Sequence, residues 1–396
     1  MPKTQPPLSS ILPPLICGTA TFNNLYNDDA FALPTTAIVQ KALALGVNAF
    51  DTSPYYGPSE ELLGKALNTD YVRANHPRGS YYLVTKVGRI AGSEFDYSAE
   101  WVRYSIQRSL QRLHTKYLDV VYCHDVEFVT AAEVLTAVRE LRRIRDTEGT
   151  VKYIGISGYP VPLLCDLAEL VLKETGEPLD CVMSYANFTL QNTTLETVGL
   201  ERLLKAGVSV VPNASPLGMG LLRGAGVPIG AKGDFHPAPQ ELRDAVQKCV
   251  KYVETRGERL EVVAIRWALE TWAVAGARVG GKGGVGISVM GVSNLAELEE
   301  TMRVWGSVVD GLELQDAPTP SLKDKSFSLQ RRAKIQHMAT EIWKVFGTWR
   351  DYTWASPDVD YVNVRTVKGV IDQIDQATPR PVAGDALFRA SKSSRL

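Results

Sequence analysis

The sequence predicts an α/β protein that folds as a closed (β/α)8 barrel. From residue 11 to about residue 316, short apolar runs alternate with amphipathic stretches at a spacing typical of strand-helix units with parallel strands. Six of these runs end in a polar residue, and only closure of the sheet brings six such ends around one mouth. An open, doubly wound sheet would show the same alternation of strands and helices, so the polar residues are what favours the closed barrel over it. They are Asp51, Lys86, His124, Ser157, Ser184 and Asn213.

The apolar runs define the expected strands, which cover residues 15–17, 47–50, 81–85, 118–123, 153–156, 181–184, 208–211 and 285–289. Between them, Trp101, Ile106 and Leu110 recur at three-and-four spacing with charged residues opposite, which predicts a helix that covers a sheet. The glycine-rich residues 281–286 match G-x-G-x-x-G but precede the last strand, whereas a dinucleotide fingerprint follows a strand. We expect a loop on the far face of the barrel there.

The pattern also predicts the organisation of the chain. Residues 8–316 form the expected barrel, and Ala317-Pro318-Thr319-Pro320 interrupts the alternation after it. Residues 317–396 form a C-terminal extension with at least one amphipathic helix, around residues 329–349. The Gly/Pro-rich residues 224–239 follow the seventh strand and therefore lie at the carboxyl face, where loops shape substrate pockets. We expect them to act as a lid or specificity loop.

Composition excludes several classes of function. With 43 basic and 44 acidic side chains the net charge is −1, so the chain lacks the basic surface typical of nucleic-acid or membrane-surface binding. The five cysteines are scattered without paired spacing, which predicts reduced thiols and no metal site. With no secretory signal and no bilayer-length apolar run, we expect a cytoplasmic protein. The ending Ser394-Arg395-Leu396 resembles a peroxisomal address, which is the alternative. Nothing in the sequence indicates an oligomeric state.

Four polar residue types at the barrel mouth predict proton-transfer chemistry. A buried carboxylate such as Asp51 keeps a neighbouring lysine such as Lys86 charged, and that ammonium lowers the pKa of a nearby phenol. A phenol tuned in this way is a usable general acid or base, and His124 could orient the reacting oxygen. Tyr55 and Tyr56 are both candidates for the phenol.

Several segments together resemble the aldo-keto reductase family over roughly residues 8 to 310. They are Asp51-Thr52-Ser53-Pro54-Tyr55-Tyr56-Gly57, Thr85-Lys86, Leu118-Asp119 through His124, Gly155-Ile156-Ser157, Ser215-Pro216-Leu217-Gly218 and Val289-Met290-Gly291-Val292-Ser293-Asn294. The resemblance implies a (β/α)8 barrel and a nicotinamide cofactor. It also implies a catalytic tetrad of Asp51, Tyr56, Lys86 and His124, because the family places its tyrosine five residues after the aspartate.

The resemblance also implies cofactor contacts, at Ser157, Ser184, Ser215, Leu217, Gly291, Val292, Ser293 and Glu297. Three positions depart from the common family pattern: Gly158 replaces an asparagine, Ser184 a glutamine and Ala214 a stacking tyrosine. Members that use NADP place cations after the last strand, where this chain has Glu297. A carboxylate would repel the 2′-phosphate but accept a hydrogen bond from a free 2′-hydroxyl. We therefore expect NAD, with NADP less favoured.

The segments 155–160 and 184–188 resemble the sugar-oxidising branch of the family, the D-arabinose 1-dehydrogenases and L-galactose dehydrogenases of ascorbate-type pathways. This resemblance implies NAD-dependent oxidation of an aldose such as D-arabinose or L-galactose at C1, giving the lactone. One alternative is an NADPH-dependent aldehyde or ketone reductase. Another, from a different class, is a nucleotide-sensing regulatory subunit.

Overall fold

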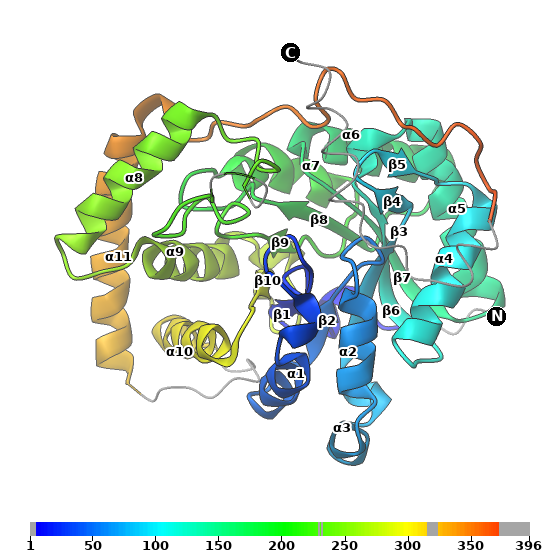
Figure 1. Cartoon of the computed structure of the whole chain (residues 1–396), viewed down its shortest axis with the longest axis horizontal. Helices are drawn as coiled ribbons and strands as arrows, with labels where there is room; N and C mark the ends of the chain where they lie inside the picture. The colour runs from blue at the N-terminus through cyan, green and yellow to red at the C-terminus, as the bar shows by residue number, and fades with distance from the viewer. Residues whose placement is uncertain (1–4, 229, 231–232, 315–323, 372–396) are drawn as a thin grey trace.

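Eight parallel strands close into a barrel, which confirms the predicted fold class (Figure 1). The structure is a computed structural model and describes residues 5–228, 230, 233–314 and 324–371. Around the barrel the strands follow the order β1-β10-β9-β8-β7-β6-β3-β2. Their bounds are β1 Leu15–Gly18, β2 Ala49–Asp51, β3 Tyr82–Val87, β6 Leu118–His124, β7 Val151–Gly158, β8 Cys181–Tyr185, β9 Asn213–Ala214 and β10 Ser288–Gly291.

Helices surround the barrel, and a small antiparallel hairpin of β4 (Arg89–Ala91) and β5 (Glu94–Phe95) follows β3. The helices are α1 Thr35–Ala44, α2 Ser59–Leu67, α3 Asp70–Asn75, α4 Ala99–Arg112, α5 Ala131–Thr147, α6 Val161–Thr175, α7 Leu200–Lys205, α8 Gln240–Glu254, α9 Leu260–Ala275, α10 Leu295–Leu312 and α11 Lys325–Phe346. Short helical turns are η1 Leu8–Ser10, η2 Ala30–Ala32, η3 Arg78–Ser80, η4 Val126–Phe128, η5 Leu195–Gly199, η6 Ala277–Val279 and η7 Gly347–Trp349. None of the described helices is both long and apolar enough to span a bilayer.

The alternation of side chains along each strand builds two apolar layers. On β3 and β6, Val84 and Val120 belong to the cluster that fills the barrel, while Leu83 and Val121 belong to the larger cluster between strands and helices. Successive residues of a strand point to opposite faces, so one strand supplies both layers. The carboxyl ends of the strands are thereby left to the polar residues.

Most predicted strands lie within two residues of the observed ones, but the seventh was predicted too early. We expected residues 208–211, whereas β9 covers Asn213–Ala214 and Val210 makes only an isolated bridge to Cys181. Pro212 lies between the two, and proline has no N–H to donate to a neighbouring strand, so it interrupts the ladder. The glycine-rich residues 281–286 precede β10, where Lys282 N donates to Leu12 O ahead of β1, which confirms the far-face loop.

The predicted helix of the extension is α11, and it packs against α8, α9 and α10. Its buried face includes Ile335, Met338 and Ile342. A charged cluster joins it to α9, where Glu270 lies 2.8 Å from Arg332 of α11 and 3.4 Å from Arg266. The predicted boundary between barrel and extension, at residue 316, lies outside the described residues.

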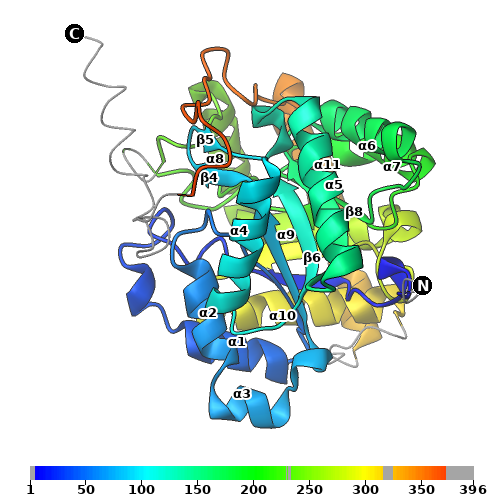
Figure 2. The same ribbon diagram turned by 90° about the vertical axis from the view of Figure 1, so that its right-hand side faces the viewer.

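After α11 the chain crosses the carboxyl mouth of the barrel as an irregular segment, residues 347–371, which we call the strap (Figures 1 and 2). The Asp351 carboxylate accepts hydrogen bonds from the backbone N–H and hydroxyl of Thr193. Near the end of the strap, Arg365 pairs with Glu94 and Asp96 beside the β4–β5 hairpin. The strap thus bridges opposite sides of the mouth.

Candidate active site

Three adjacent strands bring Asp51, Lys86 and His124 to one rim of the barrel. Asp51 ends β2, His124 ends β6, and Lys86 is the penultimate residue of β3 between them. The register pairs Asp51 with Val84 and Lys86 with Tyr122, so each of the three lies two residues further along its strand than the one before and all point to the same face of the sheet. Their convergence follows from strand order and register.

The pair Lys86 and Asp51 forms the buried centre of this group. Lys86 Nζ lies 2.7 Å from Asp51 Oδ1 and donates to Thr52 O at 2.9 Å, and its side chain is only 1% exposed. Burial raises the pKa of Asp51, and the Lys86 ammonium opposes that rise. Asp51 Oδ2 has no hydrogen-bond partner among the described residues. A buried ion pair of this kind fixes both side chains, because each would be costly to bury alone.

Tyr56 and His124 complete the predicted tetrad. Their ring centroids lie 5.6 Å apart at an interplanar angle of 88°, and Lys86 Nζ lies 4.8 Å from the Tyr56 ring centroid. Ser53 Oγ lies 3.0 Å from His124 Nδ1. The four side chains therefore form one contiguous group at the carboxyl rim of the barrel.

The electrostatics of the group differ in one respect from the sequence-based prediction. We expected Lys86 to lower the pKa of the tyrosine, but burial, followed by Asp51 and Asp125, raises the pKa of Tyr56 well above its ordinary value. Burial, Lys86 and Arg89 lower the pKa of His124 well below its ordinary range. At neutral pH the site therefore holds a neutral phenol and a neutral imidazole.

Two predicted cofactor residues lie on the same rim. Ser157 pairs with His124 in the sheet register, and its Oγ donates to Cys123 O at 3.4 Å. Ser184 pairs with Gly158, and its Oγ accepts from Asn187 Nδ2 at 3.0 Å. Asn187 is a polar residue at this rim to which the sequence analysis assigned no role.

The segment with Ser215 and Leu217 forms a tight loop after β9. Ser215, Gly218 and Met219 all have φ between 54° and 58°, which is left-handed backbone. Gly218 N donates to Ser215 O at 2.8 Å, and the His236 ring lies 2.8 Å from Gly218 O through Nε2. Successive backbone N–H groups in such a loop make a concave site suited to an anion.

The last predicted cofactor segment, from Gly291 to Glu297, connects β10 with the N-terminus of α10. Asn294 caps this helix by accepting from Glu297 N, and Glu297 Oε2 accepts from Ser293 N at 2.8 Å. Thr21 Oγ1 donates to Val292 O and joins the segment to the loop after β1. The 18-residue helix α10 follows β10, which pairs with β9, so its N-terminus and the Ser215 loop follow neighbouring strands. A helix N-terminus favours the phosphates of a dinucleotide. The residues present therefore fit a nicotinamide dinucleotide.

Glu297 is not the isolated carboxylate that the NAD argument assumed. Arg223, from the loop after β9, lies 3.5 Å from Glu297 Oε1, and both side chains are partly exposed. The sequence analysis missed this cation because it belongs to a segment 74 residues away. It compensates the charge of Glu297 at the position where a 2′-phosphate was expected to be repelled.

The family model described as "Aldo/keto reductase family" matches residues 14–313. The chain belongs to the aldo/keto reductase family. It is 42% identical over 288 residues to the D-arabinose 1-dehydrogenase of Saccharomyces cerevisiae, covering 72% of this chain and 81% of that protein. To the L-galactose dehydrogenase of Arabidopsis thaliana it is 36% identical over 264 residues, covering 66% and 76%. Enzymes of this family use nicotinamide cofactors.

A solved structure supports the fold independently. The glycerol dehydrogenase of Gluconobacter oxydans covers 89% of this chain and 96% of its own length, with a TM-score of 0.55 at 21% identity. At that identity the likeness concerns the barrel architecture alone.

The structure also places charged residues beside the tetrad that sequence analysis missed. Arg89, which begins the β4–β5 hairpin, forms an ion pair with Asp125, the residue after His124. Tyr97 donates to His124 O at 2.6 Å from the far side of the hairpin. The available signal in the sequence was the group of polar residues His124, Asp125 and Glu127 at a strand end. The hairpin that brings Arg89 to this group has no comparable pattern.

Glu127 is a buried acid at the edge of this group. Its Oε1 accepts from Tyr159 N at 3.0 Å and from Ser356 Oγ at 3.1 Å, while Oε2 has no partner among the described residues. Burial, with a smaller effect of Asp125, raises the pKa of Glu127 to about 8. A Cβ at Gly158 would lie 2.4 Å from Glu127 Oε2, so this carboxyl group occupies the space of a side chain at residue 158.

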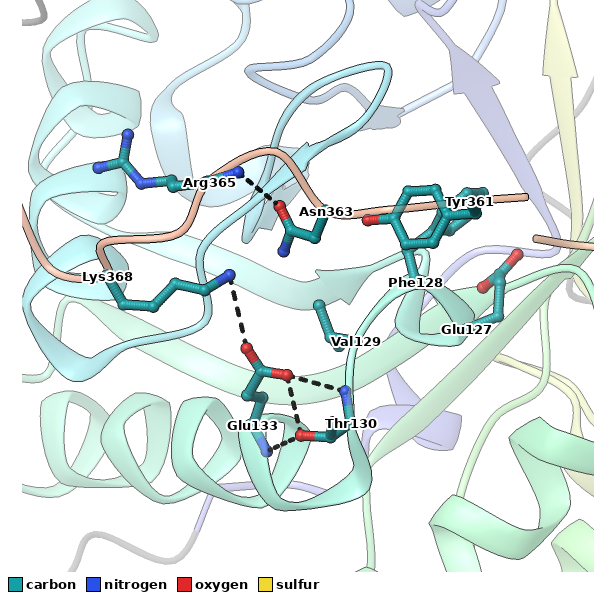
Figure 3. Close-up of a pocket in the computed structure, with 9 residues that line it drawn as sticks. All are labelled: Glu127, Phe128, Val129, Thr130, Glu133, Tyr361, Asn363, Arg365 and Lys368. Carbon is teal, nitrogen blue, oxygen red and sulfur yellow. Dashed lines mark hydrogen bonds and ion pairs between the residues drawn. The ribbon is translucent and has the colours of Figure 1, made fainter. Parts of the chain in front are cut away.

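Glu127 also lines a cavity of about 380 Å³ beneath the strap. Figure 3 shows Tyr361, Asn363, Arg365 and Lys368 of the strap on one side and the segment from Glu127 to Glu133 on the other. None of the tetrad residues lines it. The cavity is therefore a neighbour of the candidate active site and separate from its reacting groups.

Proposed function

We propose that the chain is an NAD-dependent aldose 1-dehydrogenase that oxidises D-arabinose, L-galactose or a related sugar at C1 to the lactone. The observation that carries the proposal is the contiguous group of Asp51, Tyr56, Lys86 and His124 at the barrel mouth. Similarity to two sugar dehydrogenases supports the substrate class. We also propose that the reaction feeds an ascorbate-type pathway. We propose a cytoplasmic location for the protein.

In its phenolate form, Tyr56 would act as the base that takes the proton from the C1 hydroxyl. When bound, NAD supplies the hydride acceptor and brings positive charge into the site. Positive charge near a phenol favours the phenolate, which opposes the rise in the Tyr56 pKa caused by burial and Asp51. Lys86, held by Asp51 and Thr52 O, keeps a second positive charge below the ring. The proton transfer is then general base catalysis.

His124 would orient the sugar by hydrogen-bonding to its C1 oxygen. Its lowered pKa makes the ring neutral, so one nitrogen carries the proton and the other accepts. If the Ser53 hydroxyl donates to Nδ1, the proton is on Nε2, which is then the donor to the substrate. This assignment gives Ser53 a positioning role.

Ser157, Ser184, Ser215, Leu217, Gly291, Val292, Ser293 and Glu297 would bind the cofactor. The serines at the ends of β7 and β8 lie on the tetrad's rim, which suits the nicotinamide, and the Ser215 loop with the α10 N-terminus suits the phosphates. We propose NAD because Glu297 remains available to a 2′-hydroxyl. Arg223 favours a second candidate, an NADPH-dependent carbonyl reductase, since it could pair with a 2′-phosphate.

The test is a comparison of initial rates for the purified protein, followed by the absorbance of reduced nicotinamide. D-Arabinose, L-galactose, L-fucose and D-glucose are each supplied with NAD and then with NADP. Rapid reduction of NAD by the first three supports the proposal, and lactone formation identifies the product. Activity only with NADPH and aldehydes or ketones would replace it with the reductase. Tight cofactor binding without turnover on any substrate would favour a nucleotide-sensing subunit.

A further inference from the structure

A buried ion pair, Arg89 with Asp125, lies next to the candidate reacting groups. Asp125 follows His124 in left-handed backbone, with φ of 55° and ψ of 64°, and this turn brings its Oδ2 to 3.6 Å from His124 Nε2. At that distance the carboxylate is adjacent to the imidazole but not hydrogen-bonded to it. The Asp125 carboxylate therefore lies beside the atom that would meet the reacting oxygen.

Arg89 holds this carboxylate from the other side. Gly88, with φ of 98°, turns the chain after β3, and a Cβ there would lie 2.0 Å from the Tyr97 ring. The turn directs the Arg89 guanidinium over Tyr55, with 3.8 Å from its carbon to the ring centroid and 3.0 Å from Nη2 to the Tyr55 hydroxyl. The Tyr55 ring in turn lies 5.8 Å from the His124 ring. Arg89, Asp125 and Tyr55 form one wall beside His124.

The wall keeps hydrogen-bonding capacity that the described residues do not use. The side chains of Arg89 and Asp125 are 16% and 4% exposed, so both charges are largely removed from water. Arg89 Nε is buried and has no acceptor among the described residues. Nη1 and Nη2 each carry a second N–H besides the one that bonds the Asp125 carboxylate or the Tyr55 hydroxyl. The arrangement favours a ligand that brings its own hydroxyl groups.

We infer that Arg89 and Asp125 recognise the hydroxyl group on the carbon next to the reacting one, and so select 2-hydroxy substrates. The two oxygens of a 1,2-diol are separated by a single carbon–carbon bond, so an oxygen held at His124 Nε2 places its neighbour near Asp125 and Arg89. The carboxylate can accept from that hydroxyl while the guanidinium donates to it. This inference rests on the proposed function and specifies which part of the sugar is recognised.

The experiment compares D-arabinose with 2-deoxy-D-ribose, which is the same sugar without the C2 hydroxyl. The variant Arg89→Gln/Asp125→Asn removes both charges together, so that no unpaired buried charge remains. We expect kcat/KM for D-arabinose to fall roughly 10- to 100-fold, the usual effect of losing a charged hydrogen bond, and that for 2-deoxy-D-ribose to stay nearly unchanged. The preference of the wild type for D-arabinose should therefore disappear.

The chain offers a matched control at the opposite end of β6. Arg78 and Asp119 form an ion pair with exposed fractions of 20% and 4%, close to those of Arg89 and Asp125. Arg78→Gln/Asp119→Asn should lower the melting temperature but leave the ratio of kcat/KM for the two sugars as in the wild type. Melting temperature and cofactor binding, measured for both variants, separate misfolding from lost recognition.

If the wild type oxidises sugars, two outcomes would overturn the inference. One is an equal loss of activity on both sugars in the Arg89/Asp125 variant, and the other is a wild type that does not distinguish D-arabinose from 2-deoxy-D-ribose. If the wild type oxidises no sugar, the proposed function fails and the inference is judged in the reducing direction, with glyceraldehyde against propanal. In that direction, loss of the preference for the 2-hydroxy aldehyde in the Arg89/Asp125 variant supports recognition by Arg89 and Asp125 independently of the proposed function. An unchanged ratio, or silence toward both aldehydes, overturns it.

Discussion

Trp354 of the strap stacks on Tyr159 at the end of β7, with ring centroids 4.6 Å apart and planes 10° from parallel. The His236 ring meets the same indole edge-on at 5.3 Å, and His236 contacts Gly218 of the loop after β9. Through one side chain, the C-terminal extension is thus joined to the rim that carries Ser157 and to the proposed phosphate loop.

Trp354→Ala should loosen the strap and weaken cofactor binding. Trp354 is 9% exposed, and removal of a large buried aromatic side chain costs about 3 kcal/mol of unfolding free energy. Urea denaturation measures that loss, and limited proteolysis of residues 347–371 shows whether the strap detaches. Val359→Ala is the control, because Val359 is 97% exposed on the same strap and should change neither measurement. Stability equal to that of the control would contradict the anchoring role.

Tyr56→Phe should abolish turnover and leave cofactor binding nearly intact. Loss of a general base typically costs about 100-fold or more in kcat, while the ring contacts with Lys86 and His124 are retained. Steady-state initial rates at saturating substrate give kcat, and quenching of tryptophan fluorescence gives the cofactor affinity. Tyr153→Phe removes another buried hydroxyl, bonded to Pro6 O at 2.6 Å far from the tetrad, and should keep kcat. Substantial activity in Tyr56→Phe would exclude Tyr56 as the base.

Glu297→Ala should shift the cofactor preference toward NADP. Without Glu297, Arg223 loses its partner and can pair with a 2′-phosphate, while NAD loses the acceptor for its 2′-hydroxyl. We expect the ratio of kcat/KM for NADP and NAD to rise roughly tenfold, as for one charged hydrogen bond. Glu299→Ala removes another acid of α10, paired with Lys41, and should leave the ratio unchanged. An unchanged ratio of kcat/KM for NADP and NAD would show that Glu297 does not take part in cofactor recognition.

Glu127→Gln should make the free energy of unfolding less sensitive to rising pH. The Glu127 pKa is about 8 in the folded chain and near 4.5 when exposed, so between these values only the unfolded chain has lost the proton. Stability then falls with pH by about 1.4 kcal/mol per unit, because ionisation favours unfolding. Glutamine cannot ionise but can still accept from Tyr159 N and Ser356.

The measurement is the free energy of unfolding of wild type and variant from pH 5 to pH 8. The stability of Glu127→Gln relative to wild type should rise across this range and level off above it. Glu133→Gln is the control, since hydrogen bonds from Thr130 and the charge of Lys368 lower the pKa of Glu133. Its stability difference from wild type should stay constant over the same range. A constant difference for Glu127→Gln as well would contradict the buried, protonated acid.

The barrel and the meeting of Asp51, Lys86 and His124 could be predicted because both follow from local pattern. A polar residue at the end of a buried strand needs only the strand order to find its neighbours. β9 was misplaced because hydrophobicity at Val208–Val211 outweighed the effect of Pro212 on the ladder.

The contacts of Arg89, Arg223 and Trp354 could not be predicted in the same way. Each reaches the site through an irregular loop or the strap, and Trp354 bonds through its backbone N–H to Tyr159 across 195 residues. Loop paths depend on specific packing that no periodicity records. The raised pKa of Tyr56 was missed for a related reason, because the extent of burial is a property of the finished fold.

The pairing of β1 with β10 has a consequence for the order of folding. Thr21 Oγ1 donates to Val292 O across 271 residues, so the seam closes only after nearly three quarters of the chain has been synthesised. At about 5 to 20 residues per second, the edge of β1 waits tens of seconds on the ribosome without its partner. The strands β2, β3 and β6 are adjacent and emerge early, so the tetrad can assemble before closure. The proposed dinucleotide site includes β10 and therefore forms only after the barrel has closed.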